Sequence, residues 1–449
     1  MKPTVQRNVS VVGLGKLGFP FSVCLANKGF NVWAVDNDAV KLRTLKAGHS
    51  MQYEPGLRAL WHKSRKRVHL TADYAEAIAN TNITFVVVPT PSKKDGSFTS
   101  RYVLDACRKI GKVLKDKKRF HLVVITSTVV PGTVDTKIRS ALEAESRKKC
   151  GAGFGLCYNP EFIALGSVIH DLYHPDFVLI GESDKKSGDL LSTVYAKFCG
   201  KHVPLARMNF SNAELTKLTL NAFVTMKISY ANMIKQFCEG LPGGNVDVVT
   251  GALGLDRRIG SRYLKGGLGY GGPCFPRDNL ALLHTAHKMS VRGSLPEATH
   301  EFNKREIHRL AKLVIEKLPR GGKVGILGLS YKPNTNVADE AQGVLLARFL
   351  ARKRIPVIVY DPVATDNARK LLTSRVEFAS SKAECLSQAD IAVITTPWER
   401  FKRLRGTDFK RSKRKPIVID CWRILDTAKL RNHVEYLPLG VGREITVHT

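Results

Sequence analysis

The sequence predicts an α/β protein with two doubly wound domains joined by a long central helix. Three observations carry this prediction. Residues 9–36 alternate apolar strand, glycine turn and helix, residues 210–241 form one long helical pattern, and the strand-and-turn pattern restarts at residue 323. At 449 residues the chain is also too long for a single hydrophobic core.

The first strand and helix are expected near the N-terminus. Residues 9–12, VSVV, are apolar and β-branched, as in a strand of a parallel sheet that is covered on both faces. Residues 19–29, FPFSVCLANKG, predict a helix with Pro20 in its first turn and Gly29 at its end. Residues 30–36, FNVWAVD, predict the next strand.

The turn between this strand and helix, GLGKLG, predicts a dinucleotide site of the Rossmann type. Gly13 allows a tight turn, Gly15 lets the backbone approach a pyrophosphate, and Gly18 allows the helix to pack closely. Asp36 would accept hydrogen bonds from the adenosine ribose and repel a 2′-phosphate, which favours NAD over NADP. The expected cofactor contacts are Gly13, Gly15, Lys16, Leu17, Gly18, Asp36, Lys41, Thr90 and Thr128.

Three further apolar runs predict strands, at residues 82–91, 121–133 and 154–162. Each run ends in a polar loop that contains proline. Ligands of open α/β sheets bind at the carboxyl ends of the strands. We therefore expect Thr90, Thr128 and Glu161 at one rim of the sheet.

The central helix is predicted at residues 210–241. Ser211 and Glu214 have the spacing of a capping box at its start. Lys217 and Asn221 are four residues apart, so both side chains leave the same face of the helix. Taken alone, such a pair is ordinarily a solvated helix face.

The second half predicts another doubly wound domain. Residues 323–333, KVGILGLSYKP, repeat the order of strand and glycine turn, and residues 354–362 predict a strand that ends in Asp361. Residues 389–401 echo the strand pattern of the first half. Because this half lacks a proper GxGxxG, it predicts a site for a different nucleotide, with Lys332 in reach of a phosphate.

Composition narrows the class of protein. A hydrophobic fraction of 43% and a charged fraction of 24% are ordinary for a globular protein. No run of about 18 apolar residues and no signal-peptide pattern is present, which predicts a cytoplasmic protein without a membrane span. Nine cysteines without paired spacing predict reduced thiols, and no CxxC or His-x-x-x-His pair points to a metal site.

The formal net charge of +32 is unusual, and part of it lies in residues 108–119 and 400–415. Such runs are ordinarily solvated faces, and the sharper interpretation is attraction of polyanions. The runs lack the interleaved aromatic residues of a single-strand binder, so nucleic acid is not the expected partner. A non-catalytic protein that binds nucleotides or nucleic acid on the same scaffold is the alternative from another class.

Residues 269–279, GYGGPCFPRDN, place one cysteine between two prolines. A free cysteine is more often a small core residue than a nucleophile. Taken alone, Cys274 is therefore expected to be a buried thiol. Evidence from other motifs in the chain is needed to support a role as nucleophile.

The motifs along the chain resemble those of the UDP-glucose/GDP-mannose dehydrogenases over essentially its whole length. In order they are GLGKLGFP, VPTP, STVVPGT, NPEF, NAELTKLTLNAF, RRIG, GYGGPCFPRD and GLSYKPNT. The resemblance implies an NAD domain at 1–208, a central helical dimerisation domain with the cysteine loop at 209–300, and a nucleotide-sugar domain at 301–449. It also implies a homodimer through the central helix and a role in polysaccharide biosynthesis.

The resemblance implies an NAD-dependent four-electron oxidation of the C6 hydroxyl of a nucleotide sugar. The implied catalytic residues are Cys274 as nucleophile, Lys217, Asn221, Glu161, Thr128 and Asp278. Which of Glu161, Thr128 and Asp278 takes a proton from water stays open. The implied substrate contacts are Lys217, Asn221, Arg258 across the dimer interface, Tyr263, Lys265 and Gly271; Phe162, Lys332 and Arg423 are further expected contacts.

Three positions depart from the pattern of the family. Leu165 replaces a second acidic residue, Arg277 replaces a lysine, and residues 336–342, NVADEAQ, lack the arginine that grips substrate, for which Arg423 is the candidate replacement. Phe275 favours oxidation of UDP-glucose to UDP-glucuronate, with GDP-mannose and UDP-N-acetylhexosamines as alternative substrates. A simple two-electron alcohol dehydrogenase fits less well, because that chemistry needs no thiol.

Overall fold

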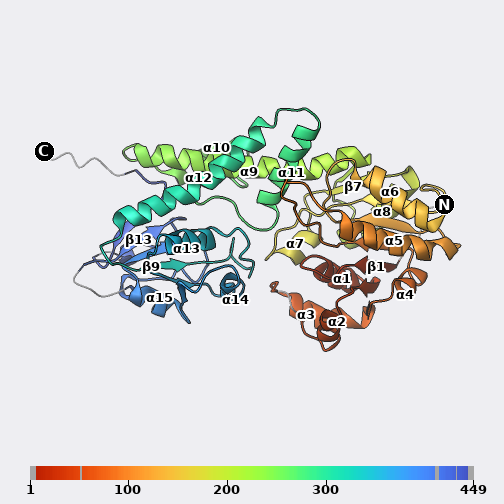
Figure 1. Cartoon of the computed structure of the whole chain (residues 1–449), viewed down its shortest axis with the longest axis horizontal. Helices are drawn as coiled ribbons and strands as arrows, with labels where there is room; N and C mark the ends of the chain where they lie inside the picture. Colours follow the sequence, from red (N-terminus) through yellow and green to blue (C-terminus); the bar gives the residue numbers. More distant parts are fainter. Residues whose placement is uncertain (1–6, 51–52, 410–413, 431, 443–449) are drawn as a thin grey trace. The chain divides into compact units, whose positions relative to one another are not determined.

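The computed structural model describes residues 7–50, 53–409, 414–430 and 432–442. The chain forms two compact units, Met1–Thr219 and Leu220–Thr449. Their boundary falls inside the long helix α9, Phe210–Gly240, drawn in light green in Figure 1. The predicted pair of doubly wound domains and the predicted central helix are confirmed.

Unit 1 contains an eight-stranded sheet in the order β3-β2-β1-β4-β5-β6-β7-β8. All neighbouring strands are parallel except β6 and β7. The strands are β1 Asn8–Val12, β2 Asn31–Val35, β3 Val68–Thr71, β4 Ile83–Val86, β5 Leu122–Ile125, β6 Gly155–Tyr158, β7 Val178–Glu182 and β8 Leu205–Met208. The strand order reverses direction between β1 and β4, which is where doubly wound sheets bind ligands.

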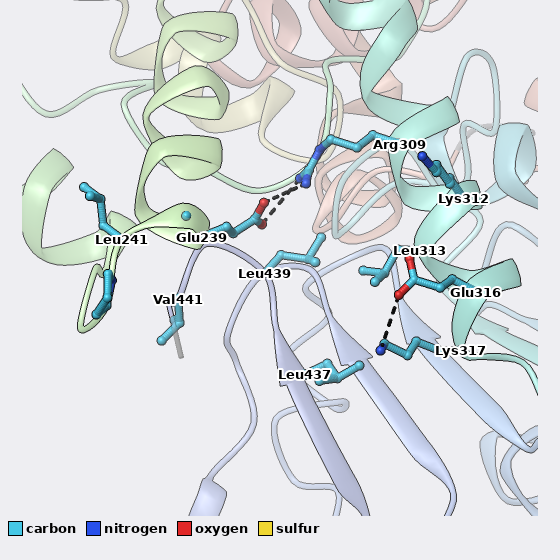
Figure 2. Close-up of a pocket in the computed structure, with 12 residues that line it drawn as sticks. Glu239, Leu241, Arg309, Lys312, Leu313, Glu316, Lys317, Leu437, Leu439 and Val441 are labelled. Carbon is cyan, nitrogen blue, oxygen red and sulfur yellow. Dashed lines mark hydrogen bonds and ion pairs between the residues drawn. The ribbon is translucent and has the colours of Figure 1, made fainter. Parts of the chain in front are cut away.

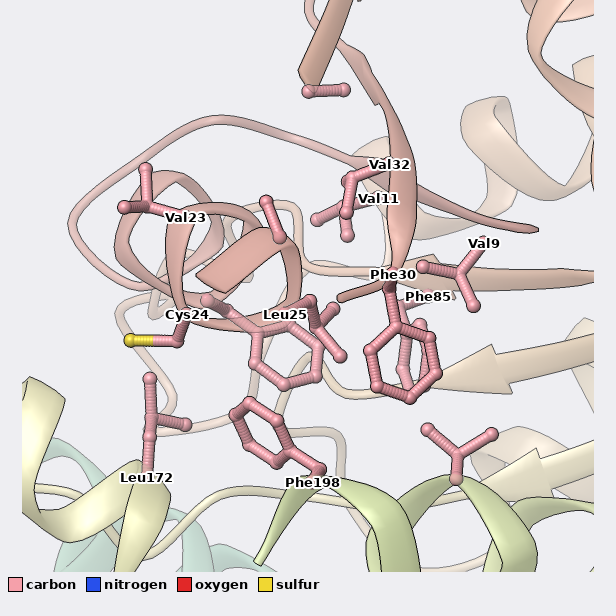
Figure 3. Packing of buried hydrophobic residues seen from close by; sticks show 14 of the residues in the cluster. Val9, Val11, Val23, Cys24, Leu25, Phe30, Val32, Phe85, Leu172 and Phe198 are labelled. Atoms are coloured by element: carbon pink, nitrogen blue, oxygen red, sulfur yellow. The ribbon is translucent and has the colours of Figure 1, made fainter. Parts of the chain in front are cut away.

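The helices of unit 1 cover both faces of this sheet. They are α1 Gly18–Asn27, α2 Ala39–Lys46, α3 Leu57–Ser64, α4 Tyr74–Ala79, α5 Arg101–Asp116, α6 Arg139–Ser146, α7 Val168–Tyr173 and α8 Lys185–Phe198, with a π-helical segment at Thr133–Ile138. Two buried clusters lie on the two faces, one of them between α1 and the strands (Figure 3). In it Phe21 meets Phe85 and Phe198 edge to face, with ring centroids 5.1 and 5.6 Å apart.

Unit 2 contains a six-stranded, fully parallel sheet in the order β11-β10-β9-β12-β13-β14. This order repeats the first six strands of unit 1. The strands are β9 Val324–Leu327, β10 Val357–Tyr360, β11 Val376–Phe378, β12 Ile391–Ile394, β13 Ile417–Asp420 and β14 Glu435–Pro438. The helices after α9 are α10 Val246–Leu255, α11 Phe275–Lys288, α12 Ser294–Lys317, α13 Gln342–Arg352, α14 Thr365–Arg369, α15 Lys382–Gln388 and α16 Thr427–Leu430.

The start of α9 differs from the prediction. The Oδ1 atom of Asn209 accepts the Asn212 N–H at 2.9 Å, so Asn209 caps the helix. The Glu214 carboxylate instead accepts the backbone N–H groups of Gly132 and Val134, at 2.6 and 2.8 Å. The predicted capping box is wrong because Glu214 is buried against the loop after β5, where two unpaired N–H groups need an acceptor.

Three compositional predictions bear on the fold. No disulfide joins any of the nine cysteines, all of which lie in the described part of the chain. Among the described residues, no helix combines the length and the apolar character that crossing a bilayer requires. In the basic run at 108–119, Arg108, Lys112 and Lys115 are exposed on α5, while residues 410–413 of the second run lie outside the described residues.

Candidate active site

The turn between β1 and α1 has the geometry that its glycines predict. Gly13 has φ +97° and donates its N–H to Val35 O at 2.8 Å. A Cβ atom at Gly18 would lie 1.8 Å from Gly13 O, so only glycine allows the helix to pack this closely. The space beside Gly15 is open, and α1 has no side-chain cap, so its positive dipole end can face a phosphate there.

Asp36 follows β2 and is buried beside this turn. Its Oδ2 atom accepts the Leu14 N–H and the Lys41 ammonium, both at 2.8 Å, and its Oδ1 atom accepts the Asp38 N–H at 3.0 Å. The carboxylate is thus hydrogen-bonded directly to the backbone of the glycine turn. The open turn, the uncapped helix and this carboxylate together fit the pyrophosphate and adenosine ribose of NAD.

The loops after β4 and β5 meet at the same edge of the sheet, as predicted. The Thr90 hydroxyl donates to Thr128 O at 2.8 Å. Thr90 is buried and Thr128 is half-buried. The two threonines therefore form one rim beyond the carboxyl ends of adjacent parallel strands.

The loop after β6 holds a lysine from α9. The Lys217 ammonium donates to Glu161 O at 2.7 Å and lies 4.5 Å from the centre of the Phe162 ring. Only 6% of Lys217 is exposed, so the interpretation as a solvated helix face is wrong for this residue. The ammonium is held by a carbonyl dipole and an aromatic face.

The Glu161 carboxyl is half-buried and has a partner that the sequence did not reveal. Tyr195, on α8, donates its hydroxyl to Glu161 Oε1 at 2.8 Å. Burial raises the pKa of Glu161, while the Tyr195 hydrogen bond and the charge of Lys217 lower it. Tyr195 lies in an amphipathic helix 34 residues away, with no local signal of this contact.

Cys274 in unit 2 is the one exposed thiol among the nine cysteines, all of which lie in the described part of the chain. It directly precedes α11, whose first turn contains Pro276. The interpretation of Cys274 as a buried thiol is therefore wrong. The proline and the helix start fix the backbone that carries the thiol.

Asp278 lies one turn into α11 and is fully buried. Its Oδ2 atom accepts the Asn221 amide at 2.6 Å, and its Oδ1 atom accepts Nε and Nη2 of Arg277, both at 3.1 Å. Asn221 is 7% exposed, which also excludes a solvated helix face. The arginine that departs from the family pattern is thus a direct partner of the predicted catalytic aspartate.

The glycine loop before Cys274 contacts the loop after β9. A Cβ atom at Gly271 would lie 2.2 Å from Glu340 O, and one at Gly272 would lie 2.7 Å from the Tyr331 ring. The altered segment at 336–342 also reaches this loop, because Gln342 Nε2 donates to Tyr270 O at 3.3 Å. Both glycines are therefore needed for packing within unit 2.

Tyr270 is a candidate that the sequence reasoning missed. Its ring lies edge-on to Phe275, with centroids 6.5 Å apart, and its hydroxyl is buried without a hydrogen-bond partner among the described residues. Burial raises the pKa of this hydroxyl, so it stays protonated at neutral pH and can donate to a ligand. Tyrosine is common in glycine loops, so its type alone is no signal.

Four other predicted substrate contacts come before or after this loop in the sequence. Arg258 is exposed and paired with Asp256 at 2.6 Å. Tyr263 is exposed, with φ +62°, and its ring lies against Phe275. Lys265 is exposed, and Lys332 is half-buried in the loop after β9.

Arg423 differs from this group because its guanidinium has internal partners. It forms a bidentate pair with Asp247, at 2.7 and 2.9 Å. It also donates to Gly266 O at 2.6 Å and to Leu439 O at 2.7 Å. These contacts connect the segment after β13 to the glycine loop. Arg423, which was predicted to replace the missing substrate arginine, thus has a structural role.

The first strand and turn of unit 2 repeat those of unit 1 with one decisive difference. Gly328 has φ +110°, and Leu329 N–H donates to Asp361 Oδ2 at 2.7 Å, as Leu14 does to Asp36. The indole N–H of Trp398 also donates to Asp361, at 3.2 Å. Asp361 is 2% exposed and surrounded by donors, so it cannot accept a ribose as Asp36 can.

A pocket of about 550 Å³ lies elsewhere in unit 2, between the end of α9, α12 and the segment after β14 (Figure 2). The pair of Glu239 and Arg309 forms part of its wall, with N and O atoms 2.6 Å apart. None of the predicted site residues lines it. It is therefore distinct from the cysteine loop.

Three family models match consecutive parts of the chain. They describe the NAD binding domain, the central domain and the UDP binding domain of the UDP-glucose/GDP-mannose dehydrogenase family, at residues 7–199, 211–305 and 325–427. The order is that of the motifs in the sequence.

Individual relatives agree with this match. The chain is 34% identical to the UDP-glucose 6-dehydrogenase AglM of Haloferax volcanii, over 93% of this chain and 97% of that protein. It is 33% identical to the UDP-glucose 6-dehydrogenase YwqF of Bacillus subtilis, over 98% of both chains. A solved UDP-glucose dehydrogenase from Pyrobaculum islandicum superimposes with a TM-score of 0.87 at 33% identity, over 97% of both chains.

Proposed function

Because the chain belongs to the UDP-glucose/GDP-mannose dehydrogenase family and is an NAD-dependent nucleotide-sugar dehydrogenase, we propose that it oxidises UDP-glucose to UDP-glucuronate. We choose UDP-glucose because the two relatives compared above are both UDP-glucose 6-dehydrogenases. The exposed Cys274 supports a four-electron rather than a two-electron oxidation, because the second oxidation, of the aldehyde, needs a nucleophile.

The cofactor site lies at the glycine turn of unit 1. Gly13, Gly15 and Gly18 accommodate the pyrophosphate, and Asp36 with Lys41 holds the adenosine ribose. A bound NAD would supply the hydride acceptor for C6, and the two oxidations would use two NAD molecules in turn. The remaining chemistry belongs to the side chains of this chain.

Cys274 turns the aldehyde into a species that can be oxidised again. Its sulfur adds to the C6 carbonyl carbon, the carbonyl oxygen takes a proton, and a thiohemiacetal forms. Loss of a hydride and the hydroxyl proton leaves a thioester. Water then adds to the thioester carbon, the C–S bond breaks, and the acid leaves with the thiol regenerated.

Lys217 and Asn221 stabilise the oxygen at C6 as negative charge develops on it. Both are nearly buried, so their charge and dipole are little screened by water. One such donor is typically worth about 3 kcal/mol in the transition state. Asp278 orients the Asn221 amide by accepting one of its hydrogen atoms.

We propose Glu161 as the base for the attacking water, with Thr128 in the rim beside it. Asp278 is the weaker candidate, because Asn221 and Arg277 already donate to both of its oxygens. Burial raises the pKa of Glu161 toward the range that suits a general base. Glu161→Gln should lower kcat by about 100-fold and remove the acidic limb of the pH–rate profile; an unchanged profile would exclude this role.

In this proposal the nucleotide sugar contacts the cysteine loop, residues 269–279, and side chains from other parts of the chain. Phe162, Arg258, Tyr263, Lys265, Gly271 and Lys332 are the proposed contacts, together with Lys217 and Asn221. Tyr270 joins them because its buried hydroxyl is an unused donor among the described residues. Arg423 acts by holding Gly266 in place.

A homodimer through the central helix is the proposed assembly. Phe223, Tyr230 and Phe237 are seven residues apart on α9 and are 59%, 47% and 60% exposed. Residues at this spacing form one apolar stripe along a helix, which is costly to leave in water. Across that interface, Arg258 is the candidate for reaching the partner's substrate.

The cytoplasm is the proposed compartment, with the uronic acid serving polysaccharide biosynthesis. Nine cysteines without a disulfide among them are typical of a reducing compartment. A disulfide that joins two of these cysteines in protein isolated from its natural host would contradict this location.

The substrate is tested with a panel of nucleotide sugars. UDP-glucose, GDP-mannose, UDP-N-acetylglucosamine and UDP-N-acetylmannosamine are each incubated with the protein and NAD, and NADH is followed by absorbance. We expect kcat/KM for UDP-glucose to exceed every other value by at least about 100-fold. A larger value for another sugar would reassign the substrate, and no NADH from any sugar would reject the activity.

A further inference from the structure

The glycine loop at residues 266–272 contains no helix or strand, although most of it is buried. Buried backbone N–H and C=O groups need partners, and a loop cannot supply them from its own ladder. Besides the contacts of Arg423 and Gln342 described above, this loop has partners on α12 and on the part of α9 that belongs to unit 2.

Asn232, on α9, holds the first part of the loop with both ends of its amide. Its Oδ1 atom accepts Gly267 N–H at 2.8 Å, and its Nδ2 atom donates to Leu268 O at 3.0 Å. Asn232 is 1% exposed. Because both donor and acceptor are used, no other residue type of this length can replace it fully.

Asn303, on α12, holds the next part in the same way. Its Oδ1 atom accepts Tyr270 N–H at 2.8 Å, and its Nδ2 atom donates to Tyr270 O at 3.0 Å. A Cβ atom at Gly269 would lie 2.4 Å from Asn303 Oδ1, so the glycine is what lets the amide approach.

A buried ion pair adds a third anchor. The Lys235 ammonium donates to Gly267 O at 2.7 Å and pairs with Glu306 of α12. The side chains of Lys235 and Glu306 are 1% and 2% exposed. Each charge needs the other at this depth, so the pair fixes the spacing of the two helices that carry the asparagines.

We propose that Asn232, Asn303 and Lys235 are positioning residues that hold the loop in its substrate-binding form before substrate arrives. The loop ends two residues before Cys274, and its last glycine donates N–H to Asp339 O at 3.0 Å. The three side chains bind five backbone groups of the loop, which are the N–H and O of Gly267, the O of Leu268, and the N–H and O of Tyr270. A loop held in this way loses little conformational freedom when substrate binds, which favours affinity and alignment of the thiol. The substrate part of this proposal rests on the proposed function.

Asn303→Ala and the isosteric Asn303→Asp test the proposal in the full-length protein. Asp keeps the acceptor for Tyr270 N–H and loses the donor to Tyr270 O. We expect amide hydrogen exchange in residues 266–274 to accelerate at least tenfold in Ala and less in Asp. With UDP-glucose, KM should rise and kcat/KM should fall at least 30-fold in Ala, while KM for NAD stays within twofold.

Asn245→Ala is the matched control. Asn245 caps α10 through Asp247 N–H and Val248 N–H and makes no hydrogen bond to the loop. This variant should lose thermal stability without faster exchange in residues 266–274 and without a change in KM for the sugar.

Two results would overturn the proposal. Unchanged exchange in residues 266–274 of Asn303→Ala would show that the asparagine does not hold the loop. Faster exchange with kcat/KM within twofold of wild type would show that the held loop does not serve binding. If wild-type protein oxidises no nucleotide sugar, the proposed function fails, and the exchange measurement still decides whether the loop is held.

Discussion

Asp36 and Lys41 place opposite charges 2.8 Å apart at the proposed site of the adenosine ribose. The carboxylate repels a 2′-phosphate, and the ammonium would attract one. Selectivity for NAD over NADP therefore depends on the carboxylate being present.

Asp36→Ser should reverse part of this selectivity. A lost hydrogen bond to a charged group costs about 1.5–3 kcal/mol, so kcat/KM with NAD should fall by roughly 10- to 100-fold. With NADP it should rise, because Lys41 remains as a phosphate partner. Steady-state kinetics with both cofactors measures the ratio.

Asp38→Ser is the control for this substitution. Asp38 is exposed and caps α2 by accepting the Val40 and Lys41 N–H groups, a role that serine also fills. Its cofactor preference should stay that of wild type. Equal preferences in the Asp36 and Asp38 variants would remove Asp36 from the account of selectivity.

Some features of the candidate site could be predicted from neighbouring residues in the sequence, and others could not. The glycine turn and Asp36 were predictable because their roles follow from neighbours within one strand, turn and helix. The Tyr195–Glu161 and Arg277–Asp278 contacts were not predictable, because the identity of a residue does not tell which side chain it contacts. The first joins residues 34 apart, and the second depends on the side-chain conformations of two adjacent residues in the partly buried helix α11.

At the scale of elements, α9 is tied to the loop after β5 through Glu214. Burial raises the pKa of Glu214 to about 7, although the N–H groups of Gly132 and Val134 lower it. A carboxyl whose pKa is higher in the folded protein binds more protons when folded. Its contribution to stability is complete below the unfolded value of 4.5 and is lost as pH rises through about 7.

The free energy of unfolding should therefore fall by about 2 kcal/mol between pH 5.5 and 8.5 on account of this one group, since one pKa unit corresponds to about 1.4 kcal/mol. Denaturant unfolding at both pH values measures it. Glu214→Gln cannot titrate, so its free energy should change by about 2 kcal/mol less over the same range. The same pH dependence in both proteins would contradict the assignment.

The strands that sequence predicts are those with a continuous apolar run. The central strands β1, β4, β5, β9 and β12 are such runs and lie between two layers of helices. The edge strands β8, LARM, and β14, EYLP, are half-exposed or contain proline, so their patterns resemble loops. The long helix α9 could be predicted from the length of its helical pattern. The burial of Lys217 and Asn221 could not, because it depends on tertiary contacts.

At the scale of the whole molecule, the exposed stripe on α9 predicts self-association. Replacing Phe223, Tyr230 and Phe237 together with serine should convert a dimer into monomers, because the stripe supplies the apolar contact area. Sedimentation velocity at micromolar concentration measures the mass. Leu371→Ser, another exposed apolar position in the same unit, should remain dimeric.

A wild-type protein that sediments as a monomer would contradict the dimer. A dimer that survives the triple substitution would place the interface elsewhere. Either result would also remove Arg258 from the proposed substrate contacts, since its proposed role requires a partner subunit across this helix.

In the proposed mechanism the cofactor binds in unit 1, the reactive thiol belongs to unit 2, and one chain performs both oxidations. The most direct test is the number of NADH molecules formed for each UDP-glucose consumed, measured for wild type and Cys274→Ser with product identified by mass. We expect two NADH and one UDP-glucuronate for wild type, and no released acid for Cys274→Ser. One NADH per sugar in wild type, or full acid production by the serine variant, would contradict it.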